Sequence, residues 1–274
     1  MSDRVSIDFH AGVADVRLNR PDKLNALDQA MMKGLVEAGQ QLAAEPGVRV
    51  VILSGEGRGF CAGLDMGSMA KLAERPKDAK PTEKQAQGLL ARPGDSLANF
   101  AQQVAWVWRD LPVPVIAAVH GVAFGGGLQL ALGADMRYVA PDARMSVMEI
   151  KWGLIPDMSG TQTLRHLVRD DVARDLTFTG RVISGEEARE LGLATRVCDD
   201  PRAAALETAQ EIASKSPSAI RAGKRLLNQS PMVSLEEGLR LEAEFQTQLI
   251  GGPNQIEAVV SNMEKRLPKF SDPE

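Results

Sequence analysis

The first half of the chain alternates between short apolar runs and a longer segment with helical spacing. From Asp28 to Ala44 apolar residues recur at the period of a helix, and Asp28 is placed to cap it. Four short runs rich in β-branched residues predict buried strands at Val13–Leu18, Val48–Leu53, Val113–Val119 and Met136–Val139. Strands separated by helical segments favour parallel pairing with crossover helices. The pattern therefore predicts an α/β core.

The strand pattern stops at Pro201, and only helical spacing follows it. The predicted helices cover Arg202–Ser214, Ser218–Asn228, Ser234–Leu249 and Asn254–Lys265. We therefore expect a core at residues 1–200 and a helical region at residues 201–274, which would pack against a partner subunit. Between Met66 and Asn99 the composition shifts to Lys, Glu, Pro and Gln, which predicts a solvated loop that could also shape the mouth of a pocket.

Composition excludes several classes of protein. The net charge of -4 gives no electrostatic footprint for nucleic acid. The sequence contains no run of 18 apolar residues, so it predicts no membrane span. The first residues lack the apolar region of an export signal. The two cysteines, Cys61 and Cys198, form neither a disulfide framework nor a metal motif. We expect a cytoplasmic protein without a bound metal.

Two glycine-rich segments, each directly after a predicted buried strand, are the candidates for chemistry. One runs from Gly55 to Met66, and the other from His120 through the glycine triplet that ends at Gly127. Glycines permit close approach of a ligand to the backbone, and a helix N-terminus leaves N–H donors free for an oxyanion. Each segment alone is more typical of ordinary turn chemistry. Neither contains the GxGxxG or GK[ST] pattern of a nucleotide site.

Together, GFCAGLDM at Gly59–Met66 and HGVAFGGG at His120–Gly127 resemble the crotonase (enoyl-CoA hydratase/isomerase) superfamily. The resemblance extends from about Val5 to Phe270. Four further stretches match the superfamily: NRPDKLNAL at Asn19–Leu27, GADMRYVAPDA at Gly133–Ala143, TGRVISGEEARELGLATRV at Thr179–Val197 and EKRLPKF at Glu264–Phe270. The resemblance implies a spiral of ββα units with a helical C-terminal trimerisation region, assembled as a homotrimer or a dimer of trimers. It implies an acyl-CoA thioester substrate of lipid metabolism, with coenzyme A as part of the substrate and no separate cofactor.

The resemblance also assigns roles to individual residues. The backbone amides of Leu64 and Gly126 would form an oxyanion hole for the thioester carbonyl. Asp65 would anchor the first loop. The residues expected to contact substrate or coenzyme A are Lys23, Leu24, Ala26, Ala62, Gly63, Asp65, Met66, Gln129 and Lys265. For Lys265 a solvated helix lysine is an equally good interpretation.

Three side chains bear on which reaction the chain would catalyse. Hydratases of the superfamily place a glutamate two residues after the glycine triplet, where this chain has Gln129, and an amide cannot exchange protons at neutral pH. Glu149 matches their second glutamate, and its apolar sequence neighbours would raise the pKa of its carboxyl. Eight residues further on, Asp157 completes a pair that resembles the dienoyl-CoA isomerases. The structural alternatives are an ion pair of Glu149 with Lys151 or Arg165, and Asp157 as a helix cap.

The resemblance therefore favours isomerisation of an enoyl- or dienoyl-CoA double bond, with Glu149 and Asp157 as the catalytic carboxylates. Two alternatives stay open. One is an enoyl-CoA hydratase that uses Glu149 alone, and the other is a non-catalytic acyl-CoA-binding member of the superfamily.

Overall fold

The computed structural model describes residues 3–67, 91–92 and 96–272. Most of the segment between Met66 and Asn99, expected to be a solvated loop, lies outside the described residues. In the described part, a six-stranded sheet has the order β1-β2-β3-β4-β6-β8, and a second, two-stranded sheet pairs β5 with β7. The chain is an α/β protein, as the strand and helix pattern predicts.

The strands of the large sheet are parallel except for the first pair. They are β1 (Val5–His10), β2 (Val13–Leu18), β3 (Val50–Gly55), β4 (Val115–Val119), β6 (Met136–Val139) and β8 (Arg196–Val197). Only β1 and β2 run antiparallel, through a turn in which Ala11 and Gly12 both have positive φ. The predictions for β2 and β6 are confirmed with their bounds, and β3 and β4 each begin two residues later than predicted.

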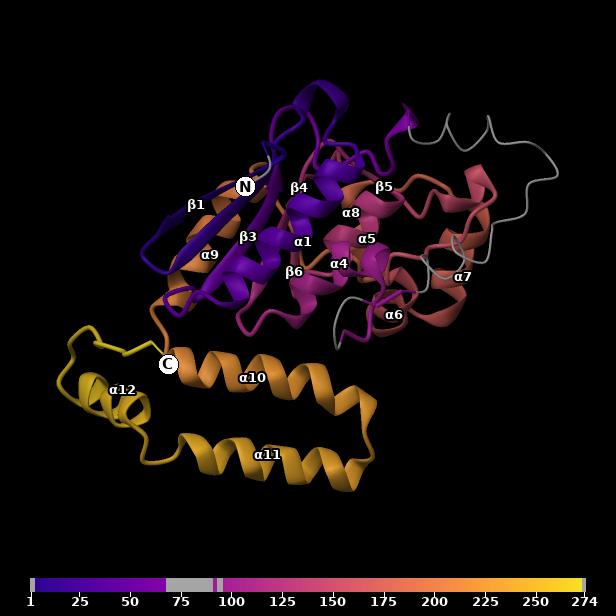
Figure 1. Ribbon diagram of the computed structural model, residues 1–274. Helices are drawn as coiled ribbons and strands as arrows, with labels where there is room; N and C mark the ends of the chain where they lie inside the picture. The colour runs from indigo at the N-terminus through magenta and orange to yellow at the C-terminus, as the bar shows by residue number, and fades with distance from the viewer. Residues whose placement is uncertain (1–2, 68–90, 93–95, 273–274) are drawn as a thin grey trace.

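Helices cover both faces of this sheet, and β3 explains why they can. Val51 and Leu53 point into one apolar cluster, while Val50 and Ile52 point into another on the opposite face. The first cluster is covered by the helices α1 (Gln29–Ala43), α4 (Phe100–Asp110) and α5 (Gly126–Leu132), and the second by α9 (Pro201–Ala213) (Figure 1). Asp28 caps α1 as predicted, since its carboxylate accepts a 2.7 Å hydrogen bond from the amide of Met31.

The remaining short elements lie beyond the carboxyl end of the sheet. The strands β5 (Val122–Phe124) and β7 (Arg144–Ser146) are parallel to each other. Two of the helical elements are short 3-10 helices, η1 (Pro21–Lys23) and η2 (Glu149–Trp152). The others are the α-helices α6 (Gly160–Leu167), α7 (Asp170–Thr179) and α8 (Gly185–Leu191). These elements surround the candidate site.

The C-terminal helices form an arm that projects from the core. The arm contains α10 (Pro217–Gln229), the short η3 (Ser230–Met232), α11 (Leu235–Leu249) and α12 (Pro253–Met263), the orange-to-yellow helices below the sheet in Figure 1. Lys224 fastens α10 to the core, because its ammonium lies 2.8 Å from both the carbonyl of Val113 and the carboxylate of Asp135. The division at residue 200 stays a prediction; in space, α9 packs on the sheet and the chain leaves the core after it.

Candidate active site

The two glycine segments lie against each other at the carboxyl edge of the large sheet. Because β2, β3 and β4 are parallel, the loops that follow them meet at one edge. Backbone hydrogen bonds join the loops: the amide of Cys61 donates to the carbonyl of Val122 (2.9 Å), and the amide of Leu27 donates to that of Gly63 (2.8 Å). Three segments distant in sequence therefore form one backbone framework.

Gly63 shows how closely these loops approach. Its φ is +84°, and a Cβ at this position would lie 2.5 Å from the carbonyl oxygen of Phe124. The same Cβ would be 3.7 Å from the amide nitrogen of Gly126. Only glycine fits both the left-handed backbone and this contact. The arrangement brings the Leu64 and Gly126 amides, the predicted oxyanion donors, to neighbouring positions.

Both of these amides are free to bind a ligand atom. The first helical hydrogen bond of α5 runs from the amide of Gln129 to the carbonyl of Gly125 (3.0 Å), so Gly126 occupies the first turn, where N–H groups have no partner within the helix. Across residues 3–67, 91–92 and 96–272, neither Leu64 nor Gly126 donates its amide hydrogen to a protein acceptor. Two adjacent free N–H groups are the geometry that stabilises an oxyanion.

Charged side chains hold the first loop in place. Arg20 lies 2.8 Å from the carboxylate of Asp65 and 3.5 Å from that of Asp28. The amide of Asp65 also donates to the carbonyl of Leu27 at 3.2 Å. The ion pair therefore ties the loop at Asp65 to Arg20, and the predicted bonds from backbone amides to Asp65 stay a prediction. His120 has a comparable role, since its Nε2 lies 3.0 Å from the carbonyl oxygen of Gly57.

Gln129 and Glu149 are bonded directly to each other. The amide Nε2 of Gln129 donates to Oε1 of Glu149 at 2.6 Å, and both side chains are buried. The other carboxylate oxygen, Oε2, is buried and has no hydrogen-bond partner. Burial raises the pKa of the Glu149 carboxyl, hydrogen bonds from its own backbone and Gln129 lower it, and the Asp157 carboxylate raises it further. A raised pKa is typical of carboxyls that act as general acids or bases.

Asp157 lies close enough for its charge to raise the pKa of Glu149, but it lies at the protein surface. Its side chain is exposed, and partial desolvation raises its pKa, against the opposing effect of its own backbone N–H. The structural alternatives are not observed among the described residues. Glu149 forms no ion pair with Lys151 or Arg165 there, and the N-cap of α6 is Ser159, without a side-chain capping bond.

One reason given for the raised pKa of Glu149 is wrong. The sequence suggested that its apolar neighbours enclose the carboxyl, yet Trp152, Leu154 and Ile155 are exposed at 42%, 48% and 74%. Gly125 and the side chain of Gln129 instead lie against the carboxyl: a Cβ on Gly125 would lie 3.3 Å from its Oε1, and Nε2 of Gln129 lies 2.6 Å from the same oxygen. The glycine triplet is itself the sequence signal for this packing, because a side chain at Gly125 would crowd the carboxyl of Glu149.

Most of the residues expected to contact coenzyme A lie together at the glycine loops. The amide of Ala62 donates to the carbonyl of Leu24 at 2.9 Å, which joins the Lys23–Ala26 stretch to the Ala62–Met66 stretch. Lys23 and Met66 are exposed beside them. Lys265 is not brought to this group within one chain. It follows α12 on a tail whose Asp272 pairs with Arg49 at 2.6 Å, near the start of β3 and opposite the loops. Its role stays a prediction.

The Cys61 thiol is buried and hydrogen-bonded within this arrangement. Burial raises the pKa of the Cys61 thiol to about 12, and its Sγ donates to the carbonyl of Asn25. Across the described residues, no three His, Cys, Asp or Glu side chains gather as metal ligands. The same residues contain no helix long and apolar enough to span a bilayer.

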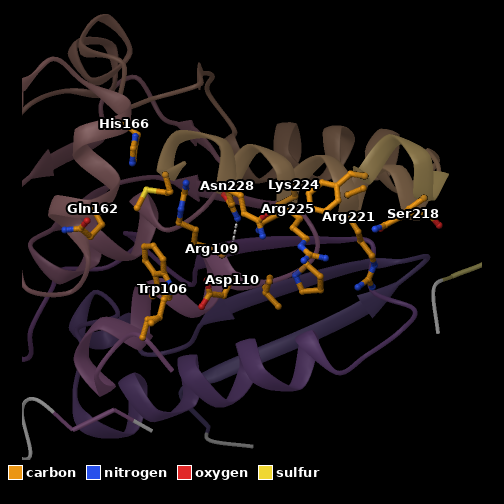
Figure 2. A pocket seen from close by; sticks show the side chains of 18 of the residues that line it. Trp106, Arg109, Asp110, Gln162, His166, Ser218, Arg221, Lys224, Arg225 and Asn228 are labelled. Carbon is orange, nitrogen blue, oxygen red and sulfur yellow. Dashed lines mark hydrogen bonds between the residues drawn. The ribbon is translucent and has the colours of Figure 1, made fainter. Parts of the chain in front are cut away.

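A large cavity of about 860 Å³ lies elsewhere, between the end of α4 and the helical arm. Figure 2 shows Trp106, Arg109 and Asp110 on one side of it and Lys224 and Arg225 on the other. It contains neither the free amides nor the Glu149 carboxyl. Size therefore does not identify the reactive site in this molecule, and the geometry of the loops does.

Comparison with known proteins agrees with this site. The sequence profile of the family "Enoyl-CoA hydratase/isomerase" matches residues 8–273. The chain is 34% identical over 269 residues to enoyl-CoA hydratase domain-containing protein 2 of Mus musculus, covering 94% of this chain and 84% of the relative. It is 34% identical over 275 residues to the mitochondrial Delta(3,5)-Delta(2,4)-dienoyl-CoA isomerase of Rattus norvegicus, covering 94% and 78%.

A solved structure has the same fold over nearly the whole chain. The crystal structure of an enoyl-CoA hydratase from Bacillus anthracis superposes with a TM-score of 0.85 at 32% identity, covering 97% of this chain and 98% of that one. The crotonase-like spiral expected from the sequence is therefore confirmed.

Proposed function

Because the chain belongs to the enoyl-CoA hydratase/isomerase family, we propose that it isomerises double bonds of an unsaturated acyl-CoA, with a 3,5-dienoyl-CoA as the best substrate. The observation that supports isomerisation over hydration is the Gln129–Glu149 hydrogen bond. In this bond Oε1 of Glu149 accepts from a side-chain amide, which cannot exchange protons. A second carboxyl, Asp157, lies near enough for its charge to raise the pKa of Glu149, and it would exchange protons at a more distant carbon.

The proposed reaction moves one proton along the acyl chain. Oε2 of Glu149 removes a proton from C2, and the C–H electrons pass into the conjugated thioester to form a dienolate. The amides of Leu64 and Gly126 donate to the oxyanion, each contributing roughly 3–4 kcal/mol. Asp157 then delivers a proton to the far end of the dienolate. Proton transfer from Glu149 back to Asp157 restores the starting state, so no oxidant or cofactor is consumed.

The substrate would enter over the two loops. We propose that Lys23, Leu24, Ala26 and the Ala62–Met66 stretch hold coenzyme A, mostly through their backbones. Trp152, Leu154 and Ile155 offer exposed apolar surface beside Glu149, where an acyl chain would cover them.

We propose a homotrimer or a dimer of trimers, formed through the arm. The support is that several apolar side chains of the arm are exposed in the part of the chain that the structure describes; Leu227, Leu235 and Met263 are 74%, 80% and 80% exposed. The cytoplasmic location stays a prediction, and several relatives are named as mitochondrial.

Two substrates test the proposed reaction. Purified protein receives a 3,5-dienoyl-CoA or a 2-enoyl-CoA, and absorbance follows formation of the conjugated 2,4-dienoyl product or loss of the 2-enoyl thioester. We expect migration of the diene, and Asp157→Asn to reduce it by about 10²-fold, the usual contribution of a general acid. Hydration of the 2-enoyl substrate without diene migration would contradict the proposal.

The second candidate is a hydratase that uses Glu149 alone. It is favoured by a relative named methylglutaconyl-CoA hydratase, from Mus musculus, at 33% identity over 266 residues. In that case Asp157→Asn would leave hydration nearly unchanged. The third candidate, a binding protein without turnover, predicts that neither substrate is converted although both bind.

A further inference from the structure

We propose that Gln129 is a positioning residue that holds Oε1 of Glu149 and leaves Oε2 without a hydrogen bond, so that Glu149 starts the reaction as the base and Asp157 as the acid. The inference rests on the proposed function for these two roles. The inference goes beyond the proposed function by assigning which oxygen of Glu149 takes the proton, and by naming Gln129 as the residue that determines this.

The orientation of the Gln129 amide is fixed by backbone donors. Its Oε1 accepts hydrogen bonds from the amides of Met158 (2.8 Å) and Gly160 (2.9 Å). A flipped amide would place its NH₂ group against these two N–H donors, so Nε2 must face Glu149. The contact is also confined, because a Cβ on Gly160 would lie 2.6 Å from Oε1 of Gln129.

A fixed N–H donor at 2.6 Å favours the charged form of the carboxyl that accepts it. It also sets the direction of the Glu149 carboxylate, with Oε1 held and Oε2 without a partner. Oε2, although buried in the protein alone, is therefore the oxygen whose lone pairs are free to take a proton from substrate. The Gln129 side chain lowers the pKa of Glu149 against the effect of burial.

Asp157 has the opposite surroundings. Apart from its own backbone N–H, no described group donates to its carboxylate, and its side chain is exposed in the free chain. An acyl chain that covers it would remove water from it and favour its neutral form. Once substrate covers it, Asp157 is therefore the carboxyl suited to give up a proton, whereas in the protein alone its carboxylate raises the pKa of Glu149. Gln129 also accepts a hydrogen bond from the backbone amide of Met158, the residue that follows Asp157. One side chain therefore holds the two segments that carry Glu149 and Asp157.

The test replaces the donor without changing the volume of the side chain. In Gln129→Met we expect kcat to fall about 10- to 100-fold, the effect of losing a hydrogen bond to a charged group, while KM changes less than about threefold. The acid limb of the kcat/KM profile should move to higher pH. Gln103→Met, at the other buried glutamine of the described residues and on α4, is the matched control and should change neither.

A second readout does not depend on turnover. Infrared titration of the free protein follows the C=O stretch of protonated carboxyls, with Glu149→Gln and Asp157→Asn identifying the bands. The midpoint for Glu149 should rise in Gln129→Met. It should rise by less in Gly160→Ala, which displaces the amide and serves if Gln129→Met does not fold.

The outcomes separate the inference from the proposed function. An unchanged Glu149 midpoint in both variants would overturn the inference, whatever the activity. A raised midpoint in a protein that fails to isomerise dienoyl-CoA would contradict the proposed function and support the control of Glu149 ionisation by Gln129. A raised midpoint with a displaced acid limb supports both.

Discussion

The glycine loops and the segment from Glu149 to Gly160 border the same site but are built differently. The loops are backbone structures, joined by amide-to-carbonyl bonds and closed to any side chain at Gly63. The second segment presents side chains, two of them titratable, and leaves Trp152 and Ile155 exposed. A backbone site can stabilise the oxyanion of any thioester, whereas the side chains decide where protons move. Variants in the loops should therefore reduce every reaction, and variants in the second segment should change which reaction occurs.

The largest effect is expected for Gly63→Ala. The new Cβ would lie 2.5 Å from the carbonyl oxygen of Phe124, and φ is +84°, so the loops must separate and the two oxyanion donors move apart. Loss of one such donor alone lowers kcat by about 10²–10³-fold. We expect a loss of at least about 10³-fold for both dienoyl- and enoyl-CoA, measured as kcat with each thioester.

Gly251→Ala is the matched control for backbone strain. Gly251 also has a positive φ, +75°, but no atom lies within 4 Å of its added Cβ, and it is in the arm. We expect a destabilisation of roughly 1 kcal/mol and unchanged turnover. Equal activity losses in the two variants would mean that strain, and not the oxyanion geometry, explains Gly63→Ala.

The next effect is expected for Glu149→Gln. Removal of the base should lower kcat for isomerisation by about 10²–10³-fold while acyl-CoA binding, measured by calorimetry, is retained. In the wild type, the base must be ionised, and burial raises its pKa, so kcat/KM should fall as the pH decreases through that raised pKa. Turnover that survives the substitution would exclude Glu149 as the base.

The same variant should alter stability with a defined sign. A carboxyl whose pKa is raised in the folded protein binds more protons there than in the unfolded chain, so stability falls as pH rises through that range. Glu149→Gln removes the free-energy cost of burying an ionised carboxyl at high pH. Its Tm should exceed that of the wild type at pH 8, and the difference should shrink as the pH falls from the raised pKa of the folded carboxyl to the lower pKa of the unfolded one.

The contrast between the two regions also explains what could be predicted from the sequence. The pattern of apolar residues predicted β2 and β6, because a buried strand is itself a run of apolar residues. It missed β1, an edge strand whose Phe9 is 50% exposed, and β5 and β7, which are three residues each. Short edge elements depend on their partners more than on their own residues.

The glycine loops could be located for a related reason. A positive φ and a close backbone approach require glycine, so the sequence must record them. The bond between Gln129 and Glu149 leaves no such record. It joins residues 20 apart, and its direction is set by the amides of Met158 and Gly160, which any residue possesses. Residue types therefore suggested the chemistry of this segment, while its hydrogen bonds required the structure.

The smallest effect, and the one that most sharpens the contrast, is expected for Gln129→Glu. One oxygen of the new carboxylate can still accept from Met158 and Gly160, and the other replaces Nε2, 2.6 Å from Oε1 of Glu149. Two carboxylates at this distance cannot both ionise, so they must share a proton, and the site gains a pair able to activate and protonate water. Hydration of 2-enoyl-CoA should rise about tenfold, at the lower end of what one acid–base group contributes, without a comparable gain in Gln129→Met. If a folded Gln129→Glu variant hydrates no faster than the wild type, residue 129 does not limit hydration, and the choice of reaction lies elsewhere in the Glu149–Gly160 segment.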